Sequence, residues 1–351
     1  MADVWAVGEA YEAYIGRWSR PVAVEFVRWL NVPPGRRWLD VGCGTGALTE
    51  TVLELADPVV VVGVDKSEGF VAHARAEVTD ERVTFRVGDA AALSLPDGGV
   101  GDGGDGGGFG GGDGGADGGG FGVVVSGLAI NFVPDPGRAA AEFARVAAPG
   151  GLAAAYVWDY AEGMGMLRQF WDAVHALEPA AAELDEGRRF PLCRPDPLRR
   201  LWADAGMDDV AVEPIEIPTV FAGFDDYWAP FLGGQGPAPA YVASLTAADR
   251  DALRDLLRDR LPTAPDGTIP LTARAWAVQG TVRGGLPGRP DGARRGEAGQ
   301  IGDERAEPGL AGRLTPRRDG RPRRVVGRTG GGPAAVGQLQ GGEGQGRGQW
   351  E

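Results

Sequence analysis

The sequence predicts an α/β fold with a doubly wound, mostly parallel sheet and an N-terminal helical cap. Short runs of β-branched residues alternate with segments whose apolar residues recur every three to four positions, which is typical of strands separated by helices. A glycine-rich turn at 42–46 follows the first strand, and an acidic residue stands at the end of each of the first three strands. Sheets of this kind bind their ligands at that carboxyl edge.

The first helix is predicted over 8–30, where aromatic and apolar residues share one face, and NVPPG at 31–35 ends it. The run VVVVGVD at 59–65 is continuously apolar, as expected of a strand buried on both faces. Ser67 is the predicted N-cap of the helix after it, and Pro149-Gly150 is expected to end the last early helix. The other early strands are predicted at 36–42, 83–89, 123–130 and 152–160, and the helices at 45–56, 67–78 and 136–151.

After residue 160 the alternation becomes less regular, which indicates elements added to the basic α/β unit. The later helices are predicted at 164–178, at 194–207 and within 224–261, one or two strands at 210–221, and a final strand at 272–282. The aromatic-rich segment 224–239 resembles a flap over a binding site.

Two segments fall outside this pattern and set the predicted domain limits. Residues 101–122 are almost entirely glycine and aspartate, so we expect a flexible loop insertion and no calcium-binding array, which needs a regular apolar position in each turn. Residues 284–351 are rich in glycine, arginine and proline without apolar periodicity, and we expect a disordered tail. The folded domain is therefore predicted to span 1–283.

Composition narrows the class of function. The formal net charge is −14, which argues against a nucleic-acid partner because such binding depends on neutralising phosphates. No apolar run approaches the length of a membrane span or of a signal peptide core. The two cysteines, Cys43 and Cys193, are too few for a disulfide framework and are expected to be reduced. We expect a cytoplasmic protein that acts on a small molecule, with no membrane partner and no metal.

The glycine-rich turn, LDVGCGTGA, is open to more than one nucleotide-binding interpretation. A P-loop is excluded because Gly46 is followed by Ala47 rather than by lysine and a hydroxyl residue. The dinucleotide pattern Gly-x-Gly-x-x-Ala is met loosely by Gly42, Gly44 and Ala47. Bare backbone at this point lets a ligand approach the N–H groups at the start of a helix.

The acidic residues add to that pattern. Asp40 stands two positions before Gly42, at the end of the first strand, and Asp65 ends the second strand, where a carboxylate can accept from two ribose hydroxyls. Asp89 follows the third strand, where it can accept from an exocyclic amine such as that of adenine. One acid on each of three successive strands indicates a single ligand across the sheet edge.

These motifs together resemble the class I S-adenosylmethionine-dependent methyltransferases, and most closely the small-molecule enzymes akin to those of ubiquinone and menaquinone biosynthesis. LDVGCGTG matches their first motif, VVGVDKS the second and VGDAAAL the third. The resemblance covers roughly 8–283 and implies a seven-stranded, Rossmann-like methyltransferase fold. One departure is that Phe121 is followed by Gly122, where the family has Phe-Asp, and the Gly/Asp-rich insertion enters there.

The resemblance also implies roles for individual residues. The glycine loop would line the methionine half of S-adenosylmethionine, and Asp40 would contact its amino group directly or through water. Asp65 would hold the ribose with Lys66 beside it, Asp89 and Ala90 would flank the adenine, and Ser126 would lie near the methionine moiety. The expected cofactor contacts are Asp40, Gly42, Cys43, Gly44, Thr45, Gly46, Asp65, Lys66, Asp89, Ala90 and Ser126.

The acceptor side carries fewer signals. Methyl transfer from a sulfonium is an in-line displacement that needs positioning above all, and a base only where the acceptor must lose a proton early. His175, on the aromatic helix after the fifth strand, is a candidate base, whereas His73 belongs to the scaffold. The candidate substrate contacts are Tyr11, Arg17, Arg20, Asn131, Trp158 and Tyr160.

Two alternatives remain open from the sequence. An NAD(P)-dependent oxidoreductase shares the acid on the second strand, but no Tyr-x-x-x-Lys pair exists because Lys66 is the only lysine. A non-catalytic protein that binds S-adenosylmethionine would keep the same three acids. The sequence predicts neither the acceptor nor the oligomeric state.

Overall fold

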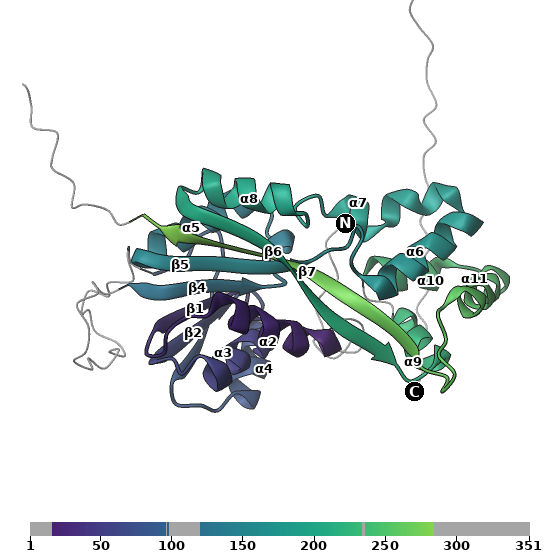
Figure 1. Cartoon of the computed structure of the whole chain (residues 1–351), viewed down its shortest axis with the longest axis horizontal. Helices are drawn as coiled ribbons and strands as arrows, with labels where there is room; N and C mark the ends of the chain where they lie inside the picture. The colour runs from purple at the N-terminus through teal and green to yellow at the C-terminus, as the bar shows by residue number, and fades with distance from the viewer. Residues whose placement is uncertain (1–15, 96, 98–119, 234–235, 284–351) are drawn as a thin grey trace, which may run out of the picture. The chain divides into compact units, whose positions relative to one another are not determined.

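A computed structural model describes residues 16–95, 97, 120–233 and 236–283. A single seven-stranded sheet has the order β3-β2-β1-β4-β5-β7-β6, in which β1 to β5 run parallel and β7 is antiparallel to both of its neighbours (Figure 1). The strands are β1 Arg37–Val41, β2 Val60–Asp65, β3 Val83–Val87, β4 Phe121–Gly127, β5 Ala147–Trp158, β6 Met207–Phe221 and β7 Ile269–Val282.

Helices cover both faces of the sheet, so the predicted doubly wound, mostly parallel α/β fold is confirmed. In Figure 1, α2, α3 and α4 lie on one face and α5 and α8 on the other. These helices are α2 Ser19–Leu30, α3 Ala47–Leu55, α4 Glu68–Glu77, α5 Pro136–Val146 and α8 Pro195–Asp204. Short 3-10 turns precede α2 and α5, at η1 Gly16–Trp18 and η3 Ile130–Phe132.

A group of helices forms a cap beyond the carboxyl ends of the parallel strands. β6 and β7 pair with each other past the end of β5, from Glu216↔Arg274 to Phe221↔Ile269, and this two-stranded ribbon extends toward the cap (Figure 1). The cap elements are α6 Gly165–Leu177, η4 Pro179–Leu184, α7 Glu186–Arg189, α9 Phe224–Trp228, η5 Ala229–Leu232, α10 Pro237–Ser244 and α11 Ala247–Arg260.

Local sequence explains the early elements well. β2 buries Val61 and Val62 completely, as its apolar run predicts, and the Ser67 hydroxyl accepts from the Phe70 N–H at the start of α4, which confirms the predicted cap. Gly63 within β2 is needed for packing, because a Cβ there would lie 2.4 Å from the Phe85 ring.

Two boundaries differ from the prediction. α5 ends at Val146 rather than at Pro149-Gly150, because Ala147 is already extended and pairs with Phe121 in β4. The pairing resumes only at Val123↔Leu152, so the proline and its neighbours form an irregularity at the start of β5. A proline disfavours helical backbone angles in the residue before it. Ala148 precedes Pro149, so the helix ends earlier than predicted.

The late strand at 210–221 is one strand, β6, which begins already at Met207. β6 tolerates Pro214 and Pro218 because it lies at the edge of the sheet, where a missing N–H removes no ladder bond. Several predictions fall on segments outside the described residues: the helix start at 8–15, most of the Gly/Asp-rich insertion and the tail 284–351. Within the described residues, no helix is long and apolar enough to cross a membrane.

Candidate functional site

A pocket of about 270 Å³ lies at the carboxyl edge of the sheet, where β1, β2, β3 and β4 end. It is lined by Ser19, Gly42, Cys43, Gly44, Thr45, Ala47, Leu48, Val64, Asp65, Lys66, Phe70, Gly88, Asp89, Ala90, Gly127, Leu128, Ala129, Phe132, Val133, Pro134 and Tyr156. Eight of the eleven residues predicted to contact the cofactor lie in this lining. The exceptions are Asp40, Gly46 and Ser126.

The glycine loop forms one wall of the pocket, and its three glycines serve different purposes. All have positive φ, at +77° for Gly42, +54° for Gly44 and +98° for Gly46. A Cβ on Gly42 would lie 2.4 Å from the Ala129 Cβ, so this glycine is required for packing against the β4–α5 connection. A Cβ on Gly44 would meet open space, so the bare backbone of Gly44 faces the pocket.

Asp65 joins the end of β2 to the glycine loop. Its Oδ2 accepts from the Gly44 N–H at 3.0 Å and its Oδ1 accepts from the Ser67 N–H at 2.8 Å. A carboxylate offers about four lone-pair sites, so two remain for hydroxyl groups of a ligand in the pocket. The carboxylate therefore both shapes the loop and presents acceptors to the cavity.

Asp89 lies on the other side of the pocket, after β3. It accepts from the Ala91 N–H at 2.9 Å and pairs with Lys66 Nζ at 3.3 Å. The Ala91 N–H, followed by the lysine, lowers the pKa of this carboxyl. Asp89 is therefore ionised at neutral pH and can accept hydrogen bonds from a ligand.

Asp40 lies beneath the loop rather than in the pocket lining. Its side chain is buried, Oδ2 accepts from the Thr49 hydroxyl at 2.7 Å, and Oδ1 has no hydrogen-bond partner among the described residues. Burial raises the pKa of Asp40 to about 7. The predicted contact of Asp40 with the amino group of the cofactor stays a prediction, as does the role of the buried Ser126.

Both cysteines have largely buried thiols. Cys43 lines the pocket but is largely buried, and burial raises the pKa of its thiol well above the usual value. Burial likewise raises the pKa of Cys193. Both cysteines are free, as predicted. Among the described residues, no group of histidine, cysteine, aspartate and glutamate side chains could hold a metal ion.

The pocket includes residues that the sequence did not identify, above all Ser19 and Tyr156. Tyr156 packs on Phe26 with ring centroids 4.5 Å apart, and a Cβ on Gly127 would lie 2.7 Å from its hydroxyl oxygen. Strand periodicity could have identified Tyr156, because it lies two residues before the candidate Trp158 and therefore on the same face of β5. Ser19 comes from the start of α2, and no local pattern links that helix to the pocket.

The residues predicted to contact the substrate do not lie together in the structure. Arg17 donates to both oxygens of Asp226, at 2.9 and 3.2 Å, and Arg20 pairs with Glu50. The other three described candidates, Asn131, Trp158 and Tyr160, lie outside the pocket lining. Trp158 and Tyr160 are buried, and their predicted contact with the substrate stays a prediction. Tyr11 lies outside the described residues.

His175 lies outside the pocket lining, in a polar cluster of the cap whose carboxylates are buried and whose histidine is partly exposed. The cluster comprises Arg168, Trp171 and His175 of α6 and Asp185 and Glu186 at α7. Asp185 accepts from Arg168 through both oxygens and from the Gly187 N–H, and its Oδ2 lies 3.8 Å from His175 Nε2. Trp171 Nε1 donates to the buried Glu186. This arrangement makes His175 part of the cap structure, and its role as a base stays a prediction.

The wild type is expected to lose stability as pH rises from about 4.5 to 7, and replacing Glu186 with glutamine is expected to abolish that loss. Burial raises the pKa of Glu186 from 4.5 to about 7. In that window the unfolded chain releases the proton while the folded chain holds it, so the free energy of unfolding falls as pH rises, by an amount on the order of 3 kcal/mol. Glutamine can still accept from Trp171.

Urea unfolding of both proteins at pH 5 and pH 8 measures this difference. We expect the wild type to lose stability relative to Glu186→Gln at the higher pH. Equal changes in the two proteins would contradict the burial of a titrating Glu186.

Comparison with known proteins finds similar sequences over part of the chain. A family model described as "Methyltransferase domain" matches residues 39–101. Nocamycin O-methyltransferase of Saccharothrix syringae is 30% identical over 145 residues, or 40% of this chain and 44% of that protein. Ubiquinone biosynthesis O-methyltransferase of Methylococcus capsulatus is 25% identical over 197 residues, or 56% of this chain and 73% of that protein.

Solved structures give similar matches. Phosphoethanolamine N-methyltransferase 2 of Haemonchus contortus, in complex with S-adenosyl-L-methionine, has a TM-score of 0.48 and 17% identity, and the match covers 80% of this chain and 58% of that chain. The curated relatives are matched over part of their length, with less than half of the nocamycin enzyme covered.

The order of the strands, the glycine loop and the carboxylates that flank the pocket are those of an α/β fold with a nucleoside-type binding site, and residues 39–101 match the methyltransferase domain. Over part of its length the chain is similar to the S-adenosylmethionine-dependent methyltransferases, and S-adenosylmethionine is the cofactor of that family. The donor set fits that molecule, because bare backbone at Gly44 and carboxylates at Asp65 and Asp89 suit a nucleoside joined to a cationic amino acid.

Proposed function

We propose that this protein transfers a methyl group from S-adenosylmethionine to a small-molecule acceptor, chiefly by positioning the two reactants. The observation that carries the proposal is the pocket in which Gly44, Asp65 and Asp89 converge from three strand ends. When bound, S-adenosylmethionine supplies a methyl group already activated on a sulfonium. The residues of the chain then have to bind, orient and exclude water.

Each part of the pocket has a defined task in this proposal. The glycine loop accommodates the methionine half against bare backbone, and the free lone pairs of Asp65 accept from the two ribose hydroxyls. Asp89 accepts from the exocyclic amine of adenine, and Ala90 lies beside the base. The anionic carboxylates also favour a cationic ligand over a neutral one of the same shape.

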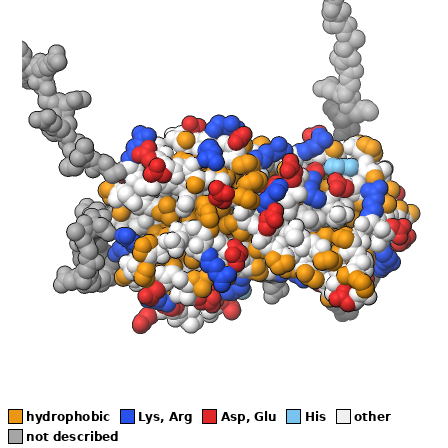
Figure 2. All heavy atoms as spheres, in the orientation of Figure 1, with side chains coloured by type: hydrophobic (Ala, Val, Ile, Leu, Met, Phe, Trp, Pro, Cys, Tyr) orange, Lys and Arg blue, Asp and Glu red, His pale blue; other side chains and the backbone are white. Residues whose placement is uncertain are grey.

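A small-molecule acceptor is favoured over RNA on two grounds. The net charge of the chain is −14, and on the face shown in Figure 2 the described acidic and basic side chains are interspersed rather than gathered in a basic patch. Two relatives are named for nocamycin and for ubiquinone biosynthesis, whereas a relative named as a ribosomal RNA methyltransferase matches 17% of this chain. We further propose a cytoplasmic location.

The wall that faces the cap is aromatic, and we place the acceptor there. Phe132 lines the pocket, Phe190 packs on Phe132 at 5.3 Å between ring centroids, and Tyr160 packs on Phe190 at 5.2 Å. The Arg17–Asp226 pair joins η1, which precedes α2, to α9 of the cap. These surroundings favour a planar or apolar acceptor.

Calorimetric titration with S-adenosylhomocysteine and, separately, with NAD tests the cofactor. Binding of S-adenosylhomocysteine alone supports the proposal, and binding of NAD alone would favour the oxidoreductase. Incubation with S-adenosylmethionine and host metabolite extract, followed by mass spectrometry for a gain of about 14 Da, the mass of one CH₂, tests turnover. Binding without any methylated product would favour a non-catalytic binding protein.

Deleting residues 101–120 is expected to leave the affinity for S-adenosylhomocysteine unchanged within about twofold, which is below about 0.5 kcal/mol. The insertion joins β4 at Phe121, the amino end of that strand, whereas the pocket is lined from Gly127 at its carboxyl end. Titration of the deletion variant measures the affinity. A tenfold loss would show that the insertion contributes to the cofactor side.

A further inference from the structure

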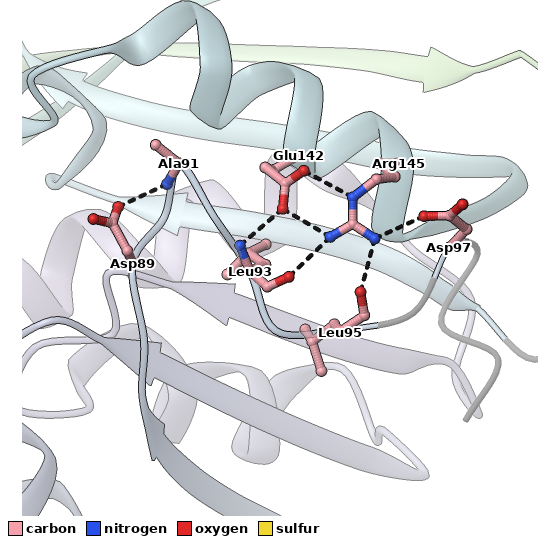
Figure 3. Close-up of polar contacts among 7 residues, drawn as sticks. All are labelled: Asp89, Ala91, Leu93, Leu95, Asp97, Glu142 and Arg145. Atoms are coloured by element: carbon pink, nitrogen blue, oxygen red, sulfur yellow. Dashed lines mark hydrogen bonds and ion pairs between the residues drawn. The ribbon is translucent and has the colours of Figure 1, made fainter. Parts of the chain in front are cut away.

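Two residues of α5 hold the loop that follows β3. Arg145 donates to the carbonyl oxygens of Leu93 and Leu95, at 2.9 and 2.7 Å, and to Asp97 at 2.8 Å (Figure 3). Glu142 accepts from the Leu93 N–H at 2.8 Å, so both polar groups of that residue's backbone are bound by α5. We call Glu142 and Arg145 the α5 clamp.

The two side chains of the α5 clamp also bind each other. Glu142 and Arg145 lie one helical turn apart and form a bidentate pair, with Nε to Oε1 and a terminal nitrogen to Oε2, both at 2.7 Å. Bidentate arginine–carboxylate pairs are directional as well as strong. The Glu142 side chain is 17% exposed, so solvent competes little for its oxygens.

The loop held in this way is also a wall of the pocket. It begins at Asp89 and Ala90, which line the pocket, and turns back on itself through the Ala92 N–H bond to the Asp89 carbonyl at 3.0 Å. Leu93, at the end of that turn, is buried and fixed by the α5 clamp. Figure 3 shows Asp89 and Ala91 at one end of the loop and Arg145 near the other.

From this geometry we propose that Glu142 and Arg145 are positioning residues that set the place of Asp89 and thereby the preference of the pocket for a base with an exocyclic amine. The inference rests on the proposed function, because it takes the loop after β3 as the nucleobase side of the cofactor site. A shift of Asp89 weakens one hydrogen bond to the base and leaves the contacts of Asp65 and the glycine loop in place.

The test compares two ligands that differ at that amine, S-adenosylhomocysteine and S-inosylhomocysteine. For the wild type we expect tighter binding of the adenosyl compound. In Glu142→Gln and Arg145→Gln the affinity for the adenosyl compound is expected to fall by roughly tenfold, equivalent to about 1.4 kcal/mol, while that for the inosyl compound changes little. The ratio of the two dissociation constants then approaches one.

Arg28→Gln is the matched control, because Glu25 and Arg28 form an ion pair of the same spacing on the exposed side of α2. Circular dichroism establishes that each variant is folded at the titration temperature, and Glu142→Gln is the milder change because glutamine can still accept from Leu93. If the ratio of the two dissociation constants is the same in both variants as in the wild type, the proposal is overturned. This holds whether the affinities for the two ligands stay unchanged or fall together. A wild type that binds neither ligand instead refutes the proposed function.

Discussion

Replacing Asp65 with asparagine is expected to weaken binding of S-adenosylhomocysteine by at least about 100-fold. Each hydrogen bond to a charged group contributes roughly 1.5–3 kcal/mol, and two such bonds to ribose hydroxyls are proposed here. Asparagine also places an N–H₂ group where the carboxylate now accepts from Gly44 or Ser67. The loop therefore loses one of the bonds that shape it, in addition to the contacts with the ligand.

Calorimetric titration of the variant measures this loss, and Asp57→Asn is a suitable control because the Asp57 side chain is 84% exposed. The control is expected to bind as the wild type does. An affinity of Asp65→Asn within threefold of the wild type would contradict the assignment of the second strand's acid to the ribose.

Replacing Asp185 with alanine is expected to lower the free energy of unfolding by roughly 2–4 kcal/mol, because the change leaves the partly buried Arg168 without its partner. The Asp185 side chain is 4% exposed and accepts from both Arg168 nitrogens. It also caps α7 through the Gly187 N–H. This carboxylate therefore stabilises α7, which precedes Phe190 in the chain.

Thermal and urea unfolding of Asp185→Ala measure the effect, with Asp172→Ala on the exposed face of α6 as the control. The double variant Arg168→Met/Asp185→Ala is expected to recover more than half of the loss, because it removes the unpaired charge. If the single and double variants are equally destabilised, the lost hydrogen bond from the Gly187 N–H at the start of α7, rather than the lost ion pair, explains the effect.

The sequence predicted the pocket well where its parts are local. The glycine loop connects one strand to the next helix, so its spacing alone places Gly44 at the sheet edge. Asp65 and Asp89 each follow a strand that is recognisable from its β-branched run. Lys66 and Ala90 come with them as chain neighbours.

The prediction was less successful where strand register or helix termination decided the outcome. The helix expected to end at Pro149-Gly150 ends at Val146, since pairing of Ala147 with Phe121 competes with the last turn of α5. Trp158 and Tyr160 were expected to face the acceptor site, and both side chains are buried, Tyr160 against Phe190. Such competition between local preference and distant partners is invisible in a window of neighbouring residues.

The sequence by itself determined the α/β class, the glycine loop and the acids at the ends of β2 and β3, because each of these depends on residues within one strand–turn–helix unit. Only the tertiary structure decided that Ser19 and Tyr156 complete the pocket and that Glu142 and Arg145 hold the loop after β3. The physical reason is that these contacts join residues far apart in the chain, and their energies depend on burial and distance, which no local spacing encodes.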